Sequence, residues 1–174
     1  KYLEYARRNP EQLRLAAIVE VNDLRRRAMA DAFGLPDKYC YAHYDDFFAD
    51  GVEADMVLIS TPENAHFDPA VKAIDAGYHV LLEKPIAQHL EECREIARRA
   101  RERGVMVGVC HVLRYHPYFA KIREIVASGE LGQVVSVNHT AAVGLDRATH
   151  SYVRGIFRRE RESNPILLAK CCND

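Results

Sequence analysis

A carboxylate and an amine stand side by side where an apolar stretch of the chain ends. Residues 79–87 read HVLLEKPIA, and the apolar part stops at Glu83, Lys84 and Pro85. A lysine whose pKa is lowered by desolvation can exchange a proton with a bound substrate, and an adjacent carboxylate can orient it. The structural alternative is a strand-end ion pair that contributes little energy.

Alternating apolar runs and helical patterns must position these residues. Short apolar runs without polar alternation are typical of strands buried on both faces, and helices of ordinary length separate them. This order predicts an α/β fold, a Rossmann-like doubly wound parallel sheet, over residues 1–130. The strands are expected at 13–20, 54–60, 78–83 and 105–109, and the helices at 1–9, 24–33, 44–50, 62–76, 90–103 and 117–127.

Residues 132–143 have a different character. The segment GQVVSVNHTAAV alternates Val135, Val137 and His139 with Ser136 and Asn138. Such alternation predicts a strand with one face on a core and the other on solvent or ligand. Residues 131–174 are therefore expected to begin a second, α/β domain with an open-faced sheet.

The carboxyl ends of the predicted strands are where a doubly wound sheet binds its ligand. Glu20 ends the first predicted strand, at the position where an acidic residue hydrogen-bonds the adenosine ribose about 20 residues after a glycine loop. Counting back from Glu20 reaches Lys1 or beyond, and no Gly-x-Gly-x-x-Gly motif occurs in the chain. The chain is expected to start inside the first helix of the domain; otherwise the domain has no phosphate loop, and Glu20 is a strand-end acid in water.

The composition excludes several other classes of protein. The formal net charge is -1, with both signs interleaved, so neither nucleic acid nor an anionic membrane is expected as a partner. No apolar segment approaches the roughly 20 residues that span a bilayer, and a cytoplasmic protein is expected. The five cysteines form no C-x-x-C pair, and the spacing of Cys110, His111 and His116 fits no common metal site, so no metal is expected.

Residues 59–87, ISTPENAHFDPAVKAIDAGYHVLLEKPIA, resemble the Gfo/Idh/MocA oxidoreductases. The resemblance rests on the Thr-Pro pair, on His66 one turn into the following helix and on the final Glu-Lys-Pro. It extends over nearly the whole chain, and both ends of the family's length are expected to be missing. It implies an NAD(P)-dependent dehydrogenase that transfers a hydride between nicotinamide and a hydroxyl carbon of a sugar, inositol or related polyol.

Roles for individual residues follow from that resemblance. Lys84 matches the family's catalytic lysine, Glu83 orients or pairs it, and the Lys-Pro peptide is often cis in relatives. Arg114 matches a family arginine near the junction of two domains. The cofactor-binding residues are expected to be Glu20, Ser60, Thr61, Pro62, His66, Glu83, Lys84 and Arg114.

The cofactor is expected to be NAD rather than NADP. Arg25, Arg26 and Arg27 follow Glu20 and could hold the 2′-phosphate of NADP, but the Glu20 carboxylate would repel it. Most of this arginine run is interpreted as a solvated helix face.

The last residues depart from the family pattern. The family places a catalytic histidine in a late motif, where this chain reads LLAKCCND with Asn173 at the expected position. Asparagine cannot act as a general acid or base. Tyr152, Arg154, Lys170 and Asn173 are the candidate substrate contacts, with His139 and His150 as further candidates.

Two other functions stay open on these residues. One is an NAD-dependent glycoside hydrolase of the same superfamily, and the other is a non-catalytic nucleotide-binding paralogue. The 174 residues alone are expected to bind NAD poorly and to be inactive, whereas the parent protein is expected to be an enzyme. Relatives commonly assemble through the second-domain sheet, so a homo-oligomer is expected for the intact protein.

Overall fold

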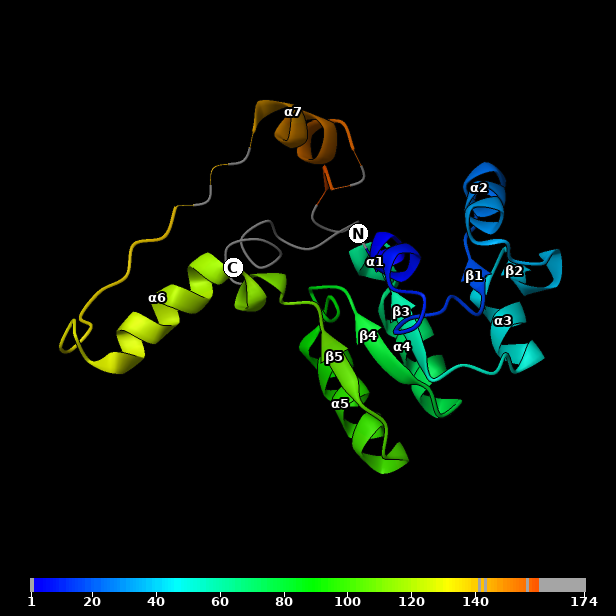
Figure 1. The fold of residues 1–174 in the computed structure, drawn as a ribbon, viewed down its shortest axis with the longest axis horizontal. Coiled ribbons are helices and arrows are strands. Elements are labelled where there is room, and N and C mark those ends of the chain that lie inside the picture. Colours follow the sequence, from blue (N-terminus) through cyan, green and yellow to red (C-terminus); the bar gives the residue numbers. More distant parts are fainter. Residues whose placement is uncertain (1, 141, 143, 156, 160–174) are drawn as a thin grey trace.

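Parallel strands alternate with helices along the first two thirds of the chain (Figure 1). The computed structural model describes residues 2–140, 142, 144–155 and 157–159. The helices are α1 (Tyr2–Arg8), α2 (Asp23–Phe33), α3 (Tyr44–Asp50), α4 (Phe67–Asp75), α5 (Leu90–Arg103), α6 (Pro117–Ser128) and α7 (Leu145–Ala148). The strands are β1 (Ile18–Val19), β2 (Cys40–Tyr41), β3 (Met56–Ile59), β4 (His79–Leu82) and β5 (Val107–Val109). Short 3₁₀ turns are η1 (Asp37–Tyr39), η2 (Glu63–Ala65) and η3 (Val112–Tyr115), and η4 (Thr149–Val153) is a π-helical turn.

The strands form two parallel pieces, one with β1 and β2 and one in the order β3-β4-β5. In a doubly wound sheet of order 3-2-1-4-5-6, these pieces correspond to the outer pair 3-2 and to the run 4-5-6. The position between β1 and β3 is filled by no strand of the described residues. The predicted α/β fold with parallel strands is confirmed.

One hydrophobic core joins the two pieces of sheet. Tyr41 on β2 and Phe47 on α3 belong to the same buried cluster as Ile59, Leu82 and Ile74 from β3, β4 and α4. The cluster is also tied by a hydrogen bond of 2.6 Å from the Tyr78 hydroxyl to the Val52 carbonyl. Shared side-chain packing, rather than hydrogen bonds between strands, therefore holds β1-β2 and β3-β4-β5 in place relative to each other.

Local signals in the sequence fix several helix ends. Asn22 precedes α2, and its side chain accepts a hydrogen bond from the Arg25 backbone N–H at 3.0 Å. Gly34 ends α2 and Gly104 ends α5, both in the left-handed conformation that glycine adopts without a steric penalty. The helices predicted at 24–33 and 90–103 are confirmed to within one residue.

The strand predicted over 132–143 is wrong for the described part of that segment. Residues 133–140 are extended but pair with no strand among the described residues. Val135 is 89% exposed and Val137 is 83% exposed, so the alternating pattern buries neither of these side chains. A strand needs a neighbour for its backbone hydrogen bonds, and sequence alternation alone supplies none.

The elements after β5 lead away from the sheet. None of the residues of α6 is buried, and Figure 1 shows this helix, the extended segment behind it and α7 at a distance from β3-β4-β5. The domain boundary predicted at residue 130 stays a prediction. Within the described residues, no helix combines the length and the apolar character needed to cross a membrane.

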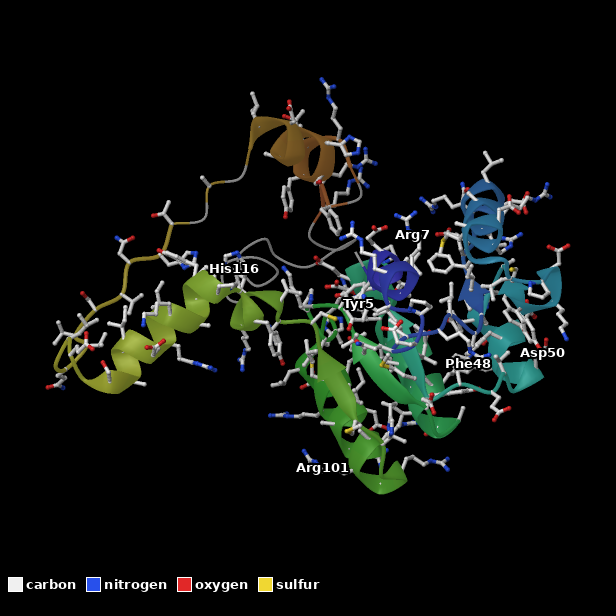
Figure 2. All side chains as sticks on the ribbon, in the orientation of Figure 1. Tyr5, Arg7, Phe48, Asp50, Arg101 and His116 are labelled. Carbon is white, nitrogen blue, oxygen red and sulfur yellow. The ribbon has the colours of Figure 1, made fainter. Side chains whose placement is uncertain are left out.

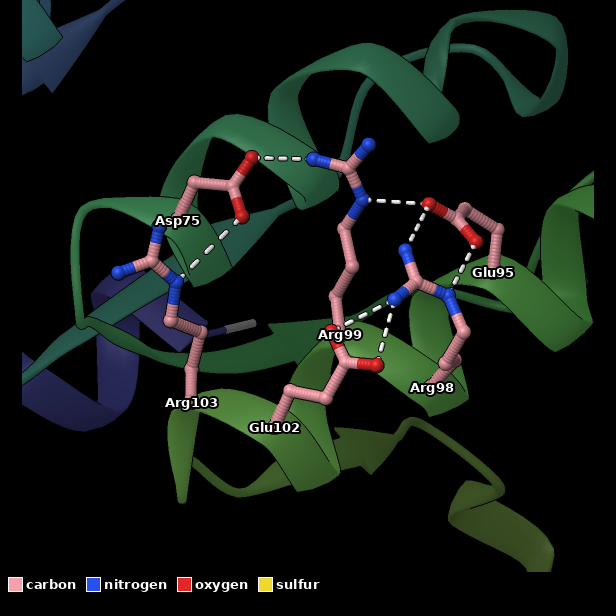
Figure 3. Close-up of polar contacts among 6 residues, drawn as sticks. All are labelled: Asp75, Glu95, Arg98, Arg99, Glu102 and Arg103. Atoms are coloured by element: carbon pink, nitrogen blue, oxygen red, sulfur yellow. Dashed lines mark hydrogen bonds and ion pairs between the residues drawn. The ribbon is translucent and has the colours of Figure 1, made fainter.

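An ion-pair network joins α4 to α5 (Figure 3). Glu95 accepts hydrogen bonds from Arg98 and Arg99, the nearest at 2.6 Å, and Arg99 also contacts Asp75 on α4. Hydrogen bonds from Arg98, and then from Arg99, lower the pKa of Glu95 to about 2. The network lies on the surface, where each ion pair contributes little to stability.

Replacing a buried residue of the central strand should destabilise the protein strongly. Leu82 on β4 is 0% exposed, so a Leu82→Ala substitution leaves a cavity and is expected to lower the free energy of unfolding by about 2–5 kcal/mol. Chemical denaturation measures the change. Met106→Ala is the matched control, because Met106 is 68% exposed and its truncation should change little. Equal effects of the two substitutions would contradict the described packing.

Glu95→Gln should remove a contribution to stability that depends on pH. Because the pKa of Glu95 in the folded protein lies below its ordinary 4.5, this contribution is complete above pH 4.5 and is lost as the pH falls toward about 2. The Tm of the variant is expected to lie slightly below that of the parent protein at neutral pH. The difference between the two Tm values should become smaller as the pH falls. Thermal denaturation at several pH values tests this, with Glu91→Gln as control because the Glu91–Arg94 pair is 4.0 Å apart and exposed. A difference in Tm between variant and parent that stays constant down to about pH 3 would refute the role of the Glu95 carboxylate.

Candidate active site at the strand ends

The pairing of β3, β4 and β5 places three predicted site segments side by side at the carboxyl ends of these strands. Ile59, Leu82 and Val109 are register partners, so Ser60, Glu83 and Cys110 follow at neighbouring strand ends. The Glu83 N–H donates to the Ile59 carbonyl and the Cys110 N–H to the Leu82 carbonyl, each at 2.9 Å. The last ladder bonds therefore hold the Glu-Lys-Pro corner on both sides.

The Glu83 carboxylate has a fixed position at this corner. Its Oε1 accepts a hydrogen bond of 2.7 Å from the Tyr2 hydroxyl, and its Oε2 accepts one of 3.2 Å from the Lys84 backbone N–H. Both oxygens are thus oriented by donors. Tyr2 was missed by the sequence analysis, because the two residues are 81 positions apart and no local pattern links them.

Two neutral side chains, those of Tyr2 and Cys110, lie near that carboxylate. Burial, hydrogen bonding with Cys110 and hydrogen bonding to Glu83 all raise the pKa of Tyr2. Burial likewise raises the pKa of the Cys110 thiol, and the neighbouring Tyr2 hydroxyl group opposes that increase. At neutral pH the phenol therefore keeps its proton and acts as the donor to Glu83.

Lys84 is half-buried directly after this carboxylate. The Lys84–Pro85 peptide bond is cis, as in relatives of the family that the sequence resembles. Because β4 is the middle strand of three, Lys84 follows the centre of the sheet rather than an edge. A ligand lying across the strand ends would meet this side chain, which can donate hydrogen bonds or exchange a proton.

His66, which is expected to be a cofactor-binding residue, has a buried ring in the structure. It is buried where η2 meets α4, and its two nitrogens lie 2.8 Å from the Pro85 carbonyl oxygen and 3.0 Å from that of Thr61. Both polar atoms of the ring therefore face backbone. Ser60, Thr61 and Pro62, by contrast, are exposed after β3.

Glu20 has the chemistry expected of a ribose-binding carboxylate. Its Oε1 accepts hydrogen bonds from the Asn22 N–H at 2.8 Å and from Arg25 Nη2 at 2.9 Å. Partial burial acts to raise the pKa of Glu20, but the hydrogen bonds from Asn22 and Arg25 outweigh it and lower the pKa. A carboxylate oxygen can also accept a hydrogen bond from a hydroxyl group, which is the chemistry that ribose binding requires; ribose binding by Glu20 stays a prediction.

The remaining predicted residues lie outside this corner. Arg114 is exposed on η3, three residues after His111. Arg154 is exposed directly after η4. The Tyr152 ring lies 6.1 Å from that of Phe157, and the His139 ring stacks on Phe119 at 6.2 Å. Figure 2 shows His116 at the start of α6. Lys170 and Asn173 lie outside the described residues.

A family model described as an oxidoreductase family with an NAD-binding Rossmann fold, GFO_IDH_MocA, matches residues 1–111. The matched region ends just after β5 and includes all five strands of the described residues. All of the strand-end residues described above therefore lie inside the match, and Arg114 lies just beyond it.

Several known proteins are similar to this chain. D-xylose 1-dehydrogenase (NADP(+)) of Haloferax volcanii is 37% identical over 122 residues, which cover 70% of this chain and 36% of that protein. An inositol dehydrogenase homologue of Azotobacter vinelandii, solved with NADH and myo-inositol, is 29% identical with a TM-score of 0.60, over 66% of this chain and 31% of that one.

The WlbA dehydrogenase of Bordetella pertussis, solved with NADH and UDP-GlcNAcA, shares the fold. It has a TM-score of 0.68 at 24% identity, over 75% of this chain and 36% of that one. This chain spans about a third of the length of the curated relatives that it matches, 37% of one and 36% of another.

Removing the Tyr2 hydroxyl should slow alkylation of Cys110. In Tyr2→Phe the thiol loses the neighbouring hydroxyl group that acts to lower its pKa, so less thiolate is present at a given pH and the rate with iodoacetamide should fall a few-fold. Mass spectrometry resolves the rate at each cysteine. Tyr5→Phe is the control on the same helix, because the Tyr5 hydroxyl donates to Gln12 instead. Faster labelling of Cys110 in Tyr2→Phe would contradict the described contact.

Proposed function

This chain belongs to the Gfo/Idh/MocA family of oxidoreductases with an NAD-binding Rossmann fold, and from that premise we propose that the complete protein is an NAD(P)-dependent dehydrogenase. Its proposed substrate is a sugar, inositol or related polyol, oxidised or reduced at a hydroxyl carbon. Its assembly into a homo-oligomer and its location in the cytoplasm stay predictions.

The observation that carries the proposal is the position of Lys84. The residue follows the central strand of β3-β4-β5, directly after a carboxylate that is held by two hydrogen bonds. Strand ends of this kind are where a doubly wound sheet binds its ligands. A lysine there can hold the oxygen of a substrate hydroxyl and accept its proton while Glu83 keeps the local charge balanced.

Two groups of residues support the cofactor half of the proposal. Glu20 would bind a ribose hydroxyl through its carboxylate, and Ser60, Thr61 and Pro62 would line the dinucleotide between that end and Lys84. The nicotinamide, when bound, supplies the acceptor or donor of the hydride. No Gly-x-Gly-x-x-Gly segment occurs among the 174 residues, so the pyrophosphate is assigned to none of them.

NAD is the proposed preference over NADP. An ionised Glu20 would repel a 2′-phosphate on the same ribose. Arg25 is engaged with this carboxylate at 2.9 Å, so its charge compensates Glu20 in the structure. The Haloferax volcanii relative carries NADP(+) in its name, so both cofactors belong in the assay.

The substrate class rests on what the relatives are named for. One is a D-xylose dehydrogenase, and a structural neighbour was solved with myo-inositol. These compounds share adjacent secondary hydroxyl groups. A lysine that hydrogen-bonds one hydroxyl oxygen suits any of them, so the proposal names the class and not one sugar.

Lys84→Ala in the complete protein should lower kcat about a hundredfold or more, because the variant has no group to exchange the hydroxyl proton. Absorbance of reduced nicotinamide is followed with NAD or NADP and with D-xylose or myo-inositol as probes. Lys38→Ala is the control, because Lys38 is exposed on η1 before the amino end of β2 and lies 4.7 Å from the centre of the Tyr39 ring.

Unchanged turnover of Lys84→Ala would remove this residue from the mechanism. Cleavage of a glycoside without net formation of reduced nicotinamide would instead identify the hydrolase of the same superfamily. Nucleotide binding without turnover of any polyol would identify the non-catalytic paralogue.

A further inference from the structure

Tyr2 ties helix α1 to the Glu-Lys-Pro corner. Its hydroxyl group donates a hydrogen bond of 2.7 Å to Glu83 Oε1, on the residue directly before Lys84 and 81 positions later in the chain. This distance is typical of a well-formed O–H···O hydrogen bond. Tyr2, Glu83 and Lys84 are all half-buried, so water competes less for this bond than it would on an open surface.

The phenol lies beside two strand ends. Burial raises the pKa of Tyr2, and the neighbouring Cys110 thiol and Glu83 raise it further. Cys110 follows β5 and is itself fixed, because it is 7% exposed and its N–H donates to the Leu82 carbonyl oxygen at 2.9 Å. In an enzyme assay near neutral pH, the Tyr2 hydroxyl group is therefore a hydrogen-bond donor held close to the ends of both β4 and β5.

The helix that carries Tyr2 gives this donor a fixed base. Ala6 lies one turn further along α1 and is 5% exposed, so the side of the helix that it shares with Tyr2 is packed against the protein. A group held by a packed helix is placed more precisely than a group held by a loop. The Tyr2 hydroxyl group can therefore act as an anchor for the side chain that it contacts.

The Glu83 carboxyl group connects this anchor to the backbone of Lys84. Its second oxygen, Oε2, accepts a hydrogen bond of 3.2 Å from the Lys84 N–H. The terminal torsion of a glutamate side chain has no sharp preference of its own, so hydrogen-bond partners set it. Because the carboxyl group is planar, a rotation that moves Oε1 also moves Oε2. The donor on α1 thus influences how the Lys84 peptide is held.

From this geometry we infer that Tyr2 is a positioning residue for the proposed reaction. Its hydroxyl group sets the orientation of the Glu83 carboxyl group, which in turn holds the backbone from which the Lys84 side chain extends. The inference rests on the proposed function, because that function gives Lys84 its catalytic role. Tyr2 acts through Glu83, and no contact with substrate or cofactor is assigned to it.

Tyr2→Phe removes the hydroxyl group and keeps the ring. In the complete protein its kcat should fall about tenfold, because small displacements of a reacting group are costly. The KM for NAD should change about twofold or less, because the carboxylate proposed to bind the ribose, Glu20, is untouched. Absorbance of reduced nicotinamide measures both constants, with NAD and with D-xylose or myo-inositol as probes.

Tyr5→Phe is the matched control for this measurement. Tyr5 lies on the same helix, is 49% exposed and donates its hydroxyl hydrogen bond to Gln12. The kcat of Tyr5→Phe should therefore equal that of the parent. An unchanged kcat in Tyr2→Phe would overturn the inference, and so would an equal loss in the two variants.

A donor at the same place on the ring should restore turnover. 4-Aminophenylalanine at position 2 has an N–H group where tyrosine has its hydroxyl group, and its kcat should lie within about threefold of the parent value. 4-Methylphenylalanine has a similar size without a donor, and its kcat should stay as low as that of Tyr2→Phe. Thermal denaturation shows whether each variant is folded. If Tyr2→Phe is not, the amino variant still decides, because a tenfold loss of its kcat would contradict the role of the hydrogen bond.

A double-mutant cycle tests whether Tyr2 acts through Glu83. Glu83→Ala removes the acceptor, so adding Tyr2→Phe to it should not lower kcat any further. Two residues with independent roles would instead multiply their effects. A further tenfold loss in the double variant would therefore rule out the path through Glu83.

The two proposals fail separately. Full turnover in Lys84→Ala would end the proposed function, and the effect of Tyr2→Phe on the labelling of Cys110 would be unchanged because it needs no turnover. A large loss of kcat in Lys84→Ala together with full turnover in Tyr2→Phe would keep the proposed function and overturn the positioning role of Tyr2.

Discussion

The central position of β4 is the constraint on which the candidate site depends. This strand is hydrogen-bonded on both sides, and the register that pairs Ile59, Leu82 and Val109 ends three strands at one level. A shift of one residue would turn Leu82 out of the core and move Glu83 and Lys84 to the opposite faces. Burial of Leu82 thus fixes the location of the polar corner as well as the fold.

The carboxylates on the surface and the carboxylate of Glu83 have different hydrogen-bond partners. On the surface between α4 and α5, arginines and carboxylates pair directly in a network that is open to solvent. At the strand end, Glu83 is held by a phenol and a backbone N–H instead. Because neither donor is charged, the carboxylate keeps its negative charge available to the neighbouring lysine.

The two ends of the proposed dinucleotide site belong to different pieces of sheet. Glu20 follows β1, whereas Ser60 and Lys84 follow β3 and β4. No described strand joins the pieces, and the shared cluster around Tyr41, Phe47 and Ile74 holds them together. Packing of α3 and α4 therefore helps to set the spacing between Glu20 and Lys84.

The sequence by itself determined α2, α5 and α6, the parallel α/β class and the strand-end positions of Glu20 and Lys84, because capping residues, glycines and apolar runs act locally. It failed at 132–143, where a strand depends on a partner that alternation cannot supply. It also could not find the bond from Tyr2 to Glu83 or the contact of His66 with the Pro85 carbonyl group. Those contacts join residues 81 and 19 positions apart, and only the packing of α1 and the pairing of β3 with β4 bring them together.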